Sequence, residues 1–284
     1  MGVFMNLVDC LQGDKTEPLI MGILNVTPDS FSDGGRYTQQ DQLIKRIEAM
    51  AEQGAHIIDI GGESTRPGAL AVGLEEEKNR VLPAIELVKQ YSDCWVSIDT
   101  YKTEVMRASL ALGVDMVNDV NALQADGALE LLAKADVAVC LMHKQGQPSD
   151  MQDKPVYNDV LKQVHDFLKT RIEVCERAGI NKKRLVLDPG FGFGKSLEHN
   201  QTLFQHLTES TPQGYPILVG VSRKTMIAEL LGGVPVEQRM LGSVVAALLS
   251  VQRGAKIVRV HDVLETAQAL SLAKALSSNE LQTR

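Results

Sequence analysis

The sequence has 284 residues, of which 44% are hydrophobic and 23% are charged, and its formal net charge at pH 7 is −7. This composition is typical of a globular protein that buries a large core. A negative net charge and only 4% aromatic residues provide neither the basic surface nor the stacking platforms that nucleic-acid binding uses. We therefore expect no nucleic-acid partner.

The cysteines and the apolar stretches bear on the cellular compartment. Cys10, Cys94, Cys140 and Cys175 are scattered without a CxxC pair or a zinc-type spacing, which favours reduced thiols. The N-terminus lacks the basic flank and apolar run of a signal peptide. The longest uncharged apolar stretch, 240–251, is shorter than the roughly 20 residues that span a bilayer. We expect a cytoplasmic location and no membrane partner.

Short apolar runs rich in β-branched residues recur along the chain and predict eight buried strands. They cover residues 19–26, 56–62, 95–100, 115–120, 137–143, 185–190, 216–222 and 256–261. Helical periodicity follows each run, with helices that end near Gly54 and Gly179 and others near 75–90, 103–112, 126–134, 198–208, 236–253 and 262–276. We predict one α/β domain over 1–284, a (β/α)8 TIM barrel with its core at about 18–276. An open doubly wound sheet is the lesser alternative.

Almost every predicted strand finishes on polar side chains. They are Asn25, Glu63, Thr65, Arg66, Asp99, Asn118, His143, Asp188, Ser222, Lys224, Arg259 and His261. Catalytic groups of such barrels lie at the C-terminal strand ends and in the loops that follow them. The pattern predicts one ring-shaped polar site, although each residue alone would also suit a helix cap or a satisfied core polar group.

Arg259 and His261 lie two residues apart in the last predicted strand and project from the same face. A planar multi-donor and a nearly neutral donor suit an anionic oxygen cluster such as pyrophosphate. The alternative pairs Arg259 with a neighbouring loop carboxylate and His261 with a backbone carbonyl. The alignment of eight polar strand ends favours the anion site.

Asp99 and Asp188 end the third and sixth predicted strands, and neither has an obvious cation nearby in sequence. A buried carboxylate is costly unless a donor satisfies it. Paired N–H donors on a ligand, such as the 2-amino-pyrimidinone edge of a pterin or guanine, would satisfy one of them. Asn118 can donate and accept, so it would read another edge of the ring. The alternative for each residue is an N-cap or Asx-turn.

The loop "DPGFGFGKS" at 188–196 ends like a phosphate-binding P-loop. The motif requires glycine five residues before Gly194, where Pro189 stands, so we favour a glycine-rich loop that brings Phe191 or Phe193 over a flat ligand. In "GVSRKTMIAELLG" at 220–232, Lys224 lies in a predicted turn into a helix, and Arg223 is expected to be solvated.

Seven segments resemble the dihydropteroate synthases of the pterin-binding enzyme family, in the family's order. They are "MGILNVTPDSFSDGG", "GAHIIDIGGESTRPG", "SIDTYKTEV", "VNDV", "DPGFGFGKSLEHN", "GVSRKTMI" and "VRVHDV". The resemblance implies a (β/α)8 fold and a homodimeric transferase that binds small-molecule substrates. Such an enzyme condenses 6-hydroxymethyl-7,8-dihydropterin pyrophosphate with 4-aminobenzoate in folate biosynthesis, and sulfonamides compete for the aminobenzoate place.

The resemblance also implies roles for individual residues. Its pterin contacts fall on Asp99, Asn118, Met142, Asp188, Gly192 and Lys224. Its pyrophosphate and Mg²⁺ contacts fall on Asn25, Arg259 and His261, with Asn25 the metal ligand and Asp59 a further support. Its aminobenzoate and sulfonamide place falls on Phe31, Asp33, Thr65, Arg66, Pro67, Phe193 and Ser222. The catalytic set is Asn25, Asp99, Asp188, Lys224, Arg259 and His261.

Two other functions share part of this pattern. Barrels that present methyltetrahydrofolate to a corrinoid protein use similar strand-end Asp and Asn residues, but they have less use for the first loop or for an Arg and His anion site. A paralogue that binds a pterin without turnover would not need Asn25, Lys224, Arg259 and His261. The predicted helix at 240–251 is either buried on both sides or part of a dimer surface.

Overall fold

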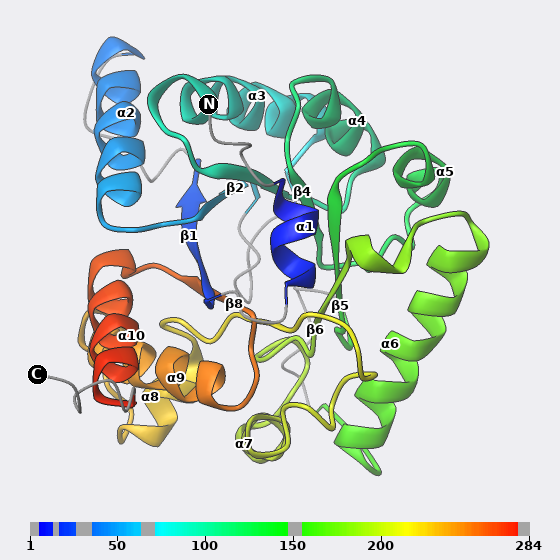
Figure 1. The fold of residues 1–284 in the computed structure, drawn as a ribbon, viewed down its shortest axis with the longest axis vertical. Coiled ribbons are helices and arrows are strands. Elements are labelled where there is room, and N and C mark those ends of the chain that lie inside the picture. Colours follow the sequence, from blue (N-terminus) through cyan, green and yellow to red (C-terminus); the bar gives the residue numbers. More distant parts are fainter. Residues whose placement is uncertain (1–5, 14–16, 27–35, 64–71, 147–154, 278–284) are drawn as a thin grey trace, which may run out of the picture.

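The computed structural model describes residues 6–13, 17–26, 36–63, 72–146 and 155–277, with the side chains of 36–39 excepted. Within these residues, eight parallel strands form a central sheet and helices surround it (Figure 1). The strands are β1 (Leu19–Asn25), β2 (Ile57–Gly61), β3 (Trp95–Asp99), β4 (Met116–Asp119), β5 (Ala138–Met142), β6 (Leu185–Asp188), β7 (Leu218–Val219) and β8 (Ile257–Val260).

The sheet order is β6-β5-β4-β3-β2-β1-β8-β7, and an isolated parallel bridge between Leu187 and Ile217 joins its two ends. A backbone hydrogen bond of 2.9 Å from Leu187 to Pro216 supports the same junction. The eight strands therefore form a nearly closed barrel. The barrel prediction is confirmed, and the alternative of an open doubly wound sheet is wrong.

The helices, after the first, alternate with the strands. They are α1 (Leu7–Gln12), α2 (Arg36–Glu52), α3 (Leu74–Tyr91), α4 (Thr103–Ala111), α5 (Ala128–Ala133), α6 (Val160–Arg177), α7 (Leu197–Gln205), α8 (Thr225–Leu230), α9 (Met240–Gln252) and α10 (Val263–Ser277). Two 3₁₀ turns, η2 (Lys182–Arg184) and η3 (Val236–Gln238), join them. Two of the helices, α8 and α9, lie between β7 and β8. Gly54 and Gly179 have φ of +98° and +94°, so they end α2 and α6 as predicted.

Each predicted strand is present, but the seventh is much shorter than expected. The predicted run of 216–222 contains only the two residues of β7. Pro216 has no N–H for a ladder. Beyond Val219, Arg223 takes a left-handed φ of +57°, so the chain is already turning toward α8.

Alternation along the strands separates two cores. One side chain in two packs outward against the helices, and the others point into the barrel. The inward residues at the N-terminal strand ends are apolar and form their own buried cluster, which includes Met21, Ile57, Met116, Cys140 and Ile257. Most inward residues of the same parity nearer the C-terminal ends are polar, with Ile23 and Met142 as apolar exceptions. The polar side chains of the sequence pattern therefore meet inside one end of the barrel.

Helix α1 belongs to this inner cluster, and the sequence analysis did not predict it. Leu7, Cys10 and Leu11 pack against the inward apolar residues, and Figure 1 shows α1 lying across the barrel. Asn6 caps the helix by accepting a hydrogen bond of 2.8 Å from the Asp9 N–H. The cap is a signal in the sequence, but six residues are too few for a periodic pattern.

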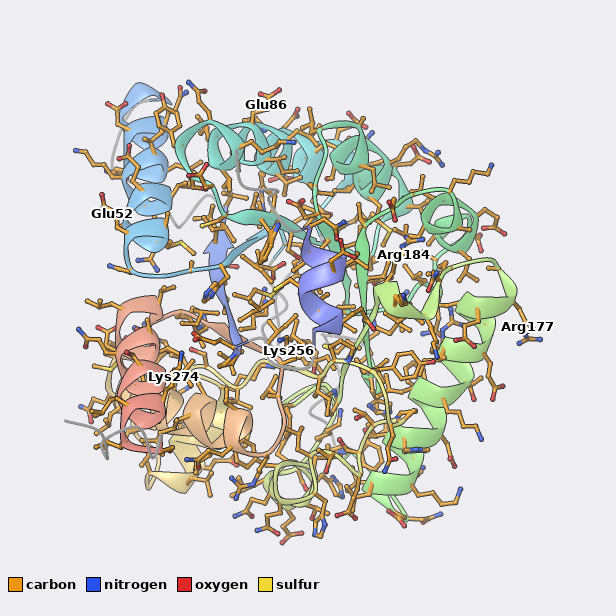
Figure 2. All side chains as sticks on the ribbon, viewed as in Figure 1. Glu52, Glu86, Arg177, Arg184, Lys256 and Lys274 are labelled. Atoms are coloured by element: carbon orange, nitrogen blue, oxygen red, sulfur yellow. The ribbon has the colours of Figure 1, made fainter. Side chains whose placement is uncertain are left out.

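Charged side chains lie on the outer face of several helices. Glu52, Glu86 and Arg177 project away from the strands at the rim of the molecule (Figure 2), and all three are exposed. No helix within the described ranges is long and apolar enough to cross a membrane. Helix α9 buries Ser243, Ala246, Ala247 and Ser250, whereas Leu241 on another side of the helix is 70% exposed.

Candidate active site

A cavity of about 660 Å³ opens at the C-terminal ends of the strands. This volume suits a small-molecule ligand. Eight of the predicted site residues line the cavity: Asn25, Asp99, Gly192, Phe193, Ser222, Lys224, Arg259 and His261. The ring-shaped polar site predicted from the strand ends is thus one hollow at the expected end of the barrel.

Three further predicted residues lie beneath this lining. Asn118, Met142 and Asp188 are 6%, 3% and 6% exposed. Asn118 is the register neighbour of Asp99, and Met142 is the register neighbour of Asp188. The predicted residues Phe31, Asp33, Thr65, Arg66 and Pro67 lie outside the described residues.

Arg259 lies at the centre of the site and is paired with two carboxylates. Its Nε lies 2.6 Å from Oδ2 of Asp59 on β2, and its Nη2 lies 2.7 Å from Oδ2 of Asp99 on β3. Asp99 has no cation nearby in sequence, as noted above, and its partner is 160 residues away in the chain. These partners stand on strands, not in a loop as the alternative for Arg259 supposed.

The two aspartates share their environment with Asn118. Burial raises the pKa of Asp99 to about 7, while Arg259 lowers it and Asp59 raises it. Asn118 Nδ2 donates to Asp59 Oδ2 at 3.2 Å. Among the described residues, Asp59 Oδ1 is buried without a hydrogen-bond partner. The floor of the cavity is thus a compact group of coupled polar side chains.

Asp188 has a different set of donors. Its Oδ1 accepts a hydrogen bond of 2.7 Å from the Gly190 N–H. Burial raises the pKa of Asp188, and Lys224, the Gly190 N–H, Lys195 and Arg259 each lower it. Because Asp99 already holds Arg259, Asp188 is the better candidate for the paired N–H donors of a flat ligand.

Lys224, in the turn between β7 and α8, contacts the loop that follows β6. Its Nζ donates to the Phe191 carbonyl at 2.6 Å and lies 4.5 Å from the centre of the Phe193 ring. Burial lowers the pKa of Lys224 to about 8, Asp188 raises it and Arg259 lowers it. The ring that lines the cavity is Phe193. Phe191, the other candidate for covering a ligand, is fully buried against Phe204.

His261 and Ser222 form a second pair at the cavity wall. Ser222 Oγ accepts from the His261 backbone N–H at 3.1 Å and lies 3.0 Å from His261 Nδ1. Because a hydroxyl oxygen can both donate and accept, this contact fits either neutral tautomer of His261.

Arg223 is partly exposed, with 34% of its side chain accessible, but it also has specific partners. Its guanidinium makes two contacts with the Asp262 carboxylate, one of them 3.0 Å from Nε to Oδ2. Its backbone N–H donates to Ser243 Oγ at 2.8 Å, and its carbonyl accepts from Arg239 at 3.0 Å. These contacts hold the left-handed backbone of Arg223, which directs Ser222 and Lys224 toward the cavity.

The 190–194 loop packs directly against the backbone that follows β5. A Cβ on Gly190 would lie 1.8 Å from the His143 carbonyl oxygen, and one on Gly194 would lie 2.2 Å from the Gln145 carbonyl oxygen. Both glycines have positive φ, of +73° and +63°, so only glycine fits. Lys195 is buried and binds backbone carbonyls. The rejection of the P-loop interpretation is consistent with this geometry.

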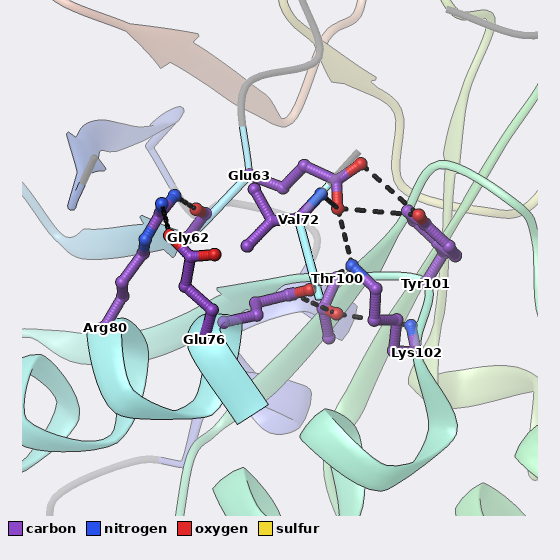
Figure 3. A network of polar contacts seen from close by, with 9 residues as sticks. Gly62, Glu63, Val72, Glu76, Arg80, Thr100, Tyr101 and Lys102 are labelled. Carbon is purple, nitrogen blue, oxygen red and sulfur yellow. Dashed lines mark hydrogen bonds and ion pairs between the residues drawn. The ribbon is translucent and has the colours of Figure 1, made fainter. Parts of the chain in front are cut away.

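A buried ionic network ties the ends of β2 and β3 together (Figure 3). Lys102 Nζ lies 2.5 Å from Glu63 Oε2 and also pairs with Glu77. Thr100 donates to Glu77 at 2.6 Å, and the Val72 N–H donates to Glu63 at 3.2 Å. Glu63 lines the cavity, so this network supports its wall beside Asp99.

Several cavity residues were not predicted as site residues from sequence. They include Asn200, Glu229, Val236 and Arg239. Asn200 holds the loop, since its Oδ1 accepts from the Gly192 N–H at 2.8 Å. None of them follows a predicted strand, so strand-end polarity offers no signal for them. Only the tertiary packing of α7, α8 and η3 brings them to the cavity.

Asn25 is the predicted metal ligand. No group of three or more His, Cys, Asp or Glu side chains within the described residues has the arrangement of a metal site. Asn25 lines the cavity with Arg259 and His261, and no hydrogen bond to its side chain occurs within the described part of the chain. An amide oxygen that faces an anion site fits Mg²⁺, which keeps several waters and takes most of its other ligands from substrate phosphates.

Comparison with known proteins gives this site a family. A model of pterin-binding enzymes matches residues 21–261. Dihydropteroate synthase of Haemophilus influenzae is 50% identical over 265 residues, which cover 93% of this chain and 96% of the relative.

Solved structures show the same relationship. Yersinia pestis dihydropteroate synthase in a sulfonamide drug complex superimposes with a TM-score of 0.85 at 50% identity, over 91% of this chain and 94% of that chain. The Xanthomonas albilineans enzyme with 4-aminobenzoic acid gives a TM-score of 0.87 at 50% identity, over 92% and 94%.

The barrel, its cavity and the family match together define the chain as a member of the pterin-binding enzyme family. Within that family it belongs with the dihydropteroate synthases, which it matches over more than nine-tenths of its length.

The depressed pKa of Lys224 leads to a pH prediction. If the ammonium form holds the ligand, affinity for the pterin pyrophosphate falls as pH rises through about 8, because deprotonation removes the positive charge of Lys224. Lys224→Arg keeps its charge over this range, so above about pH 8, where Asp99 with its pKa of about 7 is already ionised, its binding curve should stay flat, whatever its absolute affinity. Calorimetric titrations from pH 6.5 to 9.5 measure this. A wild-type affinity that is constant across the range would contradict it.

The network of Figure 3 leads to a stability prediction. Lys102→Met leaves the buried Glu77 and the half-buried Glu63 without their shared cation, which should lower the free energy of unfolding by about 3–5 kcal/mol. Urea unfolding monitored by circular dichroism measures it. Lys162→Met is the matched control, since Lys162 pairs with Asp166 on the exposed face of α6, and it should have no measurable effect. Equal stability of the two variants would count against a structural role for Lys102.

Proposed function

We propose that the chain is a transferase that condenses 6-hydroxymethyl-7,8-dihydropterin pyrophosphate with 4-aminobenzoate to form 7,8-dihydropteroate and pyrophosphate. The observation that carries this proposal is one cavity that combines two kinds of recognition. Asp188, Asn118 and Lys224 provide acceptors and donors for the edges of a flat heterocycle. Arg259 and His261 provide donors for an anion on the other side. Family membership supports the same reaction.

The reaction is a dissociative substitution at the pterin methylene carbon. The bond between this carbon and the pyrophosphate oxygen breaks, and its electron pair leaves with pyrophosphate. The arylamine nitrogen then forms the new bond to carbon and loses a proton. Asp188 and Asn118 hold the ring that carries the developing positive charge. No covalent enzyme intermediate is needed.

Arg259 can serve the leaving group without releasing its aspartates. A guanidinium has five N–H donors, and the contacts with Asp59 and Asp99 use one on Nε and one on Nη2. Three N–H groups remain for anionic oxygens. The two carboxylates therefore orient the guanidinium in advance, which is the arrangement that stabilises charge as it develops.

Magnesium and the place of the second substrate extend the proposal. Asn25 would hold Mg²⁺ through its side-chain oxygen, and the ion would neutralise charge on the pyrophosphate. The aminobenzoate place is assigned to Phe193 and Ser222 at the cavity wall, together with Phe31, Asp33, Thr65, Arg66 and Pro67. Sulfonamides would compete there. A cytoplasmic location remains a prediction from the cysteine pattern.

A homodimer is also part of the proposal. Exposed large apolar side chains gather on α8, α9 and α10, which lie together in Figure 1. They are Leu230, Leu231, Leu241, Val245, Leu264, Leu272 and Leu276. Exposed large apolar side chains on neighbouring helices are a feature of protein–protein interfaces, and a second copy would cover them through the same face.

Arg259→Met tests the reaction. Pyrophosphate release by the wild type should require both the pterin pyrophosphate and 4-aminobenzoate, and the variant should turn over ~10²-fold more slowly because the leaving-group charge loses its donors. Arg259→Lys separates charge from geometry if the methionine variant is unstable. Release without the arylamine would favour a different pterin chemistry, and absence of any release would favour a binding-only paralogue. A normal kcat in both variants would remove Arg259 from the mechanism.

Leu241→Glu tests the dimer. A charge at this exposed position should convert the dimer to a monomer, because an unpaired carboxylate is costly in an apolar interface. Light scattering coupled to size-exclusion chromatography gives the mass of each species. Val156→Glu is the control, since Val156 is equally exposed, at 70%, outside these helices. A wild-type protein that elutes as a monomer at micromolar concentration would overturn the dimer.

A further inference from the structure

The lysine of "GKS" at 194–196 is the one prominent motif residue that the proposed reaction does not use. Lys195 is only 3% exposed although it follows a loop that lines the cavity. A buried ammonium is costly unless acceptors surround it, so its contacts indicate what it stabilises.

Those contacts are with the 190–194 loop and with the end of β5. Lys195 Nζ donates to the Gly190 carbonyl at 2.7 Å and to the Phe193 carbonyl at 3.1 Å. It also lies 3.0 Å from His143 Nδ1. The three N–H groups of one ammonium thus join the two ends of the loop to the neighbouring strand.

His143 takes the acceptor role in this contact. Burial and the nearby Lys195 lower the pKa of His143 to about 3, so the imidazole is neutral and Nδ1 is free to accept. Burial also lowers the pKa of Lys195 to about 7, while Asp188 raises it. The three acceptors around Nζ match the three N–H groups of the ammonium form, since a neutral amine has only two.

The loop that Lys195 joins is the part of the site that orients Lys224. Lys224 contacts this loop at two points. Its Nζ donates to the Phe191 carbonyl at 2.6 Å, and it also lies over the Phe193 ring. Gly190, whose carbonyl Lys195 binds, donates its N–H to Asp188. Displacement of this loop would move the partners of both Asp188 and Lys224.

We propose that Lys195 is a positioning residue for pterin binding, which acts by fixing the 190–194 loop and through it Asp188 and Lys224. The proposal rests on the proposed function for the identity of the ligand. Lys195 is among the residues that line the cavity, but the loop carbonyls and His143 occupy its N–H groups, so it acts through the loop. A motif that resembles the end of a phosphate-binding loop thus uses its lysine to bind the loop's own carbonyls.

Lys195→Met tests the proposal. It keeps the length and apolar stem of the side chain and removes all the donors. The dissociation constant of 6-hydroxymethyl-7,8-dihydropterin pyrophosphate, measured by calorimetry with Mg²⁺ and without arylamine, should rise by about tenfold, the loss expected for one or two hydrogen bonds. An affinity within twofold of the wild type would overturn the proposal.

Lys89→Met is the matched control, because Lys89 also binds two backbone carbonyls, those of Leu112 and Gly113, at 2.8 and 3.0 Å. It lies on α3, away from the cavity lining. Thermal unfolding gives the unfolding midpoint of each variant. Binding is then measured well below the midpoint of the less stable one. Only Lys195→Met should lower the affinity for the pterin pyrophosphate. An equal loss of affinity in Lys89→Met would show that the effect comes from general stability, and it would overturn the proposal.

Tyr157→Phe tests the same proposal if Lys195→Met does not fold. The Tyr157 hydroxyl donates to the Gly194 carbonyl at 2.9 Å. The substitution removes this hydrogen bond and loosens the same loop, and it does not remove a buried charge. Pterin affinity should fall several-fold, and an unchanged affinity would overturn the proposal. Since the binding measurement uses the pterin alone, it gives an answer even if the condensation assay fails.

Discussion

The contact of Arg259 with Asp59 and Asp99 is the constraint on which the rest of the site depends. The guanidinium starts on β8 and reaches past β1 to carboxylates on β2 and β3. Asp59 is fully buried, and a charge in that position is tolerated only with a partner. These two ion pairs therefore fix the relative positions of β2, β3 and β8, and they keep the C-terminal end of the barrel polar.

Apolar packing confines this polar region to one end. The inward residues near the N-terminal strand ends form a closed cluster with α1, which leaves polar groups only toward the opposite opening. The loops there are held by side chains from neighbouring elements. Lys102 fixes the end of β2, Arg223 fixes the turn after β7, and Lys195 fixes the loop after β6. A rigid surround of this kind reduces the reorganisation needed when a ligand binds.

Sequence alone predicted the strands and the polar end of the barrel because both depend on local patterns. Strand parity carries the information: Asp59, Asp99 and Arg259 all stand at inward positions, and their chemistry differs from that of the apolar neighbours. Pairing across the barrel could not be predicted. Asp99 is 160 residues from Arg259, and nothing in the local sequence of either residue indicates the other.

The same limit explains why the contacts of the loop residues could not be predicted. Arg223 looks like a surface residue until α9 brings Ser243 to its backbone and Asp262 meets its guanidinium. Phe191 and Phe193 are indistinguishable in sequence, yet the positive φ values of Gly190, Gly192 and Gly194 direct one ring into the core and the other to the cavity. The turn conformation, which depends on contacts with β5, decides which of the two faces the ligand.

Charge balance is the last consequence of the central ion pair. Two buried aspartates, Asp59 and Asp188, and the partly exposed Asp99 face the cations Lys195, Lys224 and Arg259. The pKa values of Asp99, about 7, and Lys224, about 8, lie close to neutral pH. An anion among these groups favours the protonated form of each, since a proton removes negative charge from one and adds positive charge to the other. The binding of an anion at this site is therefore linked to the binding of protons, whereas a neutral heterocycle depends mainly on how accurately its donors meet Asp188.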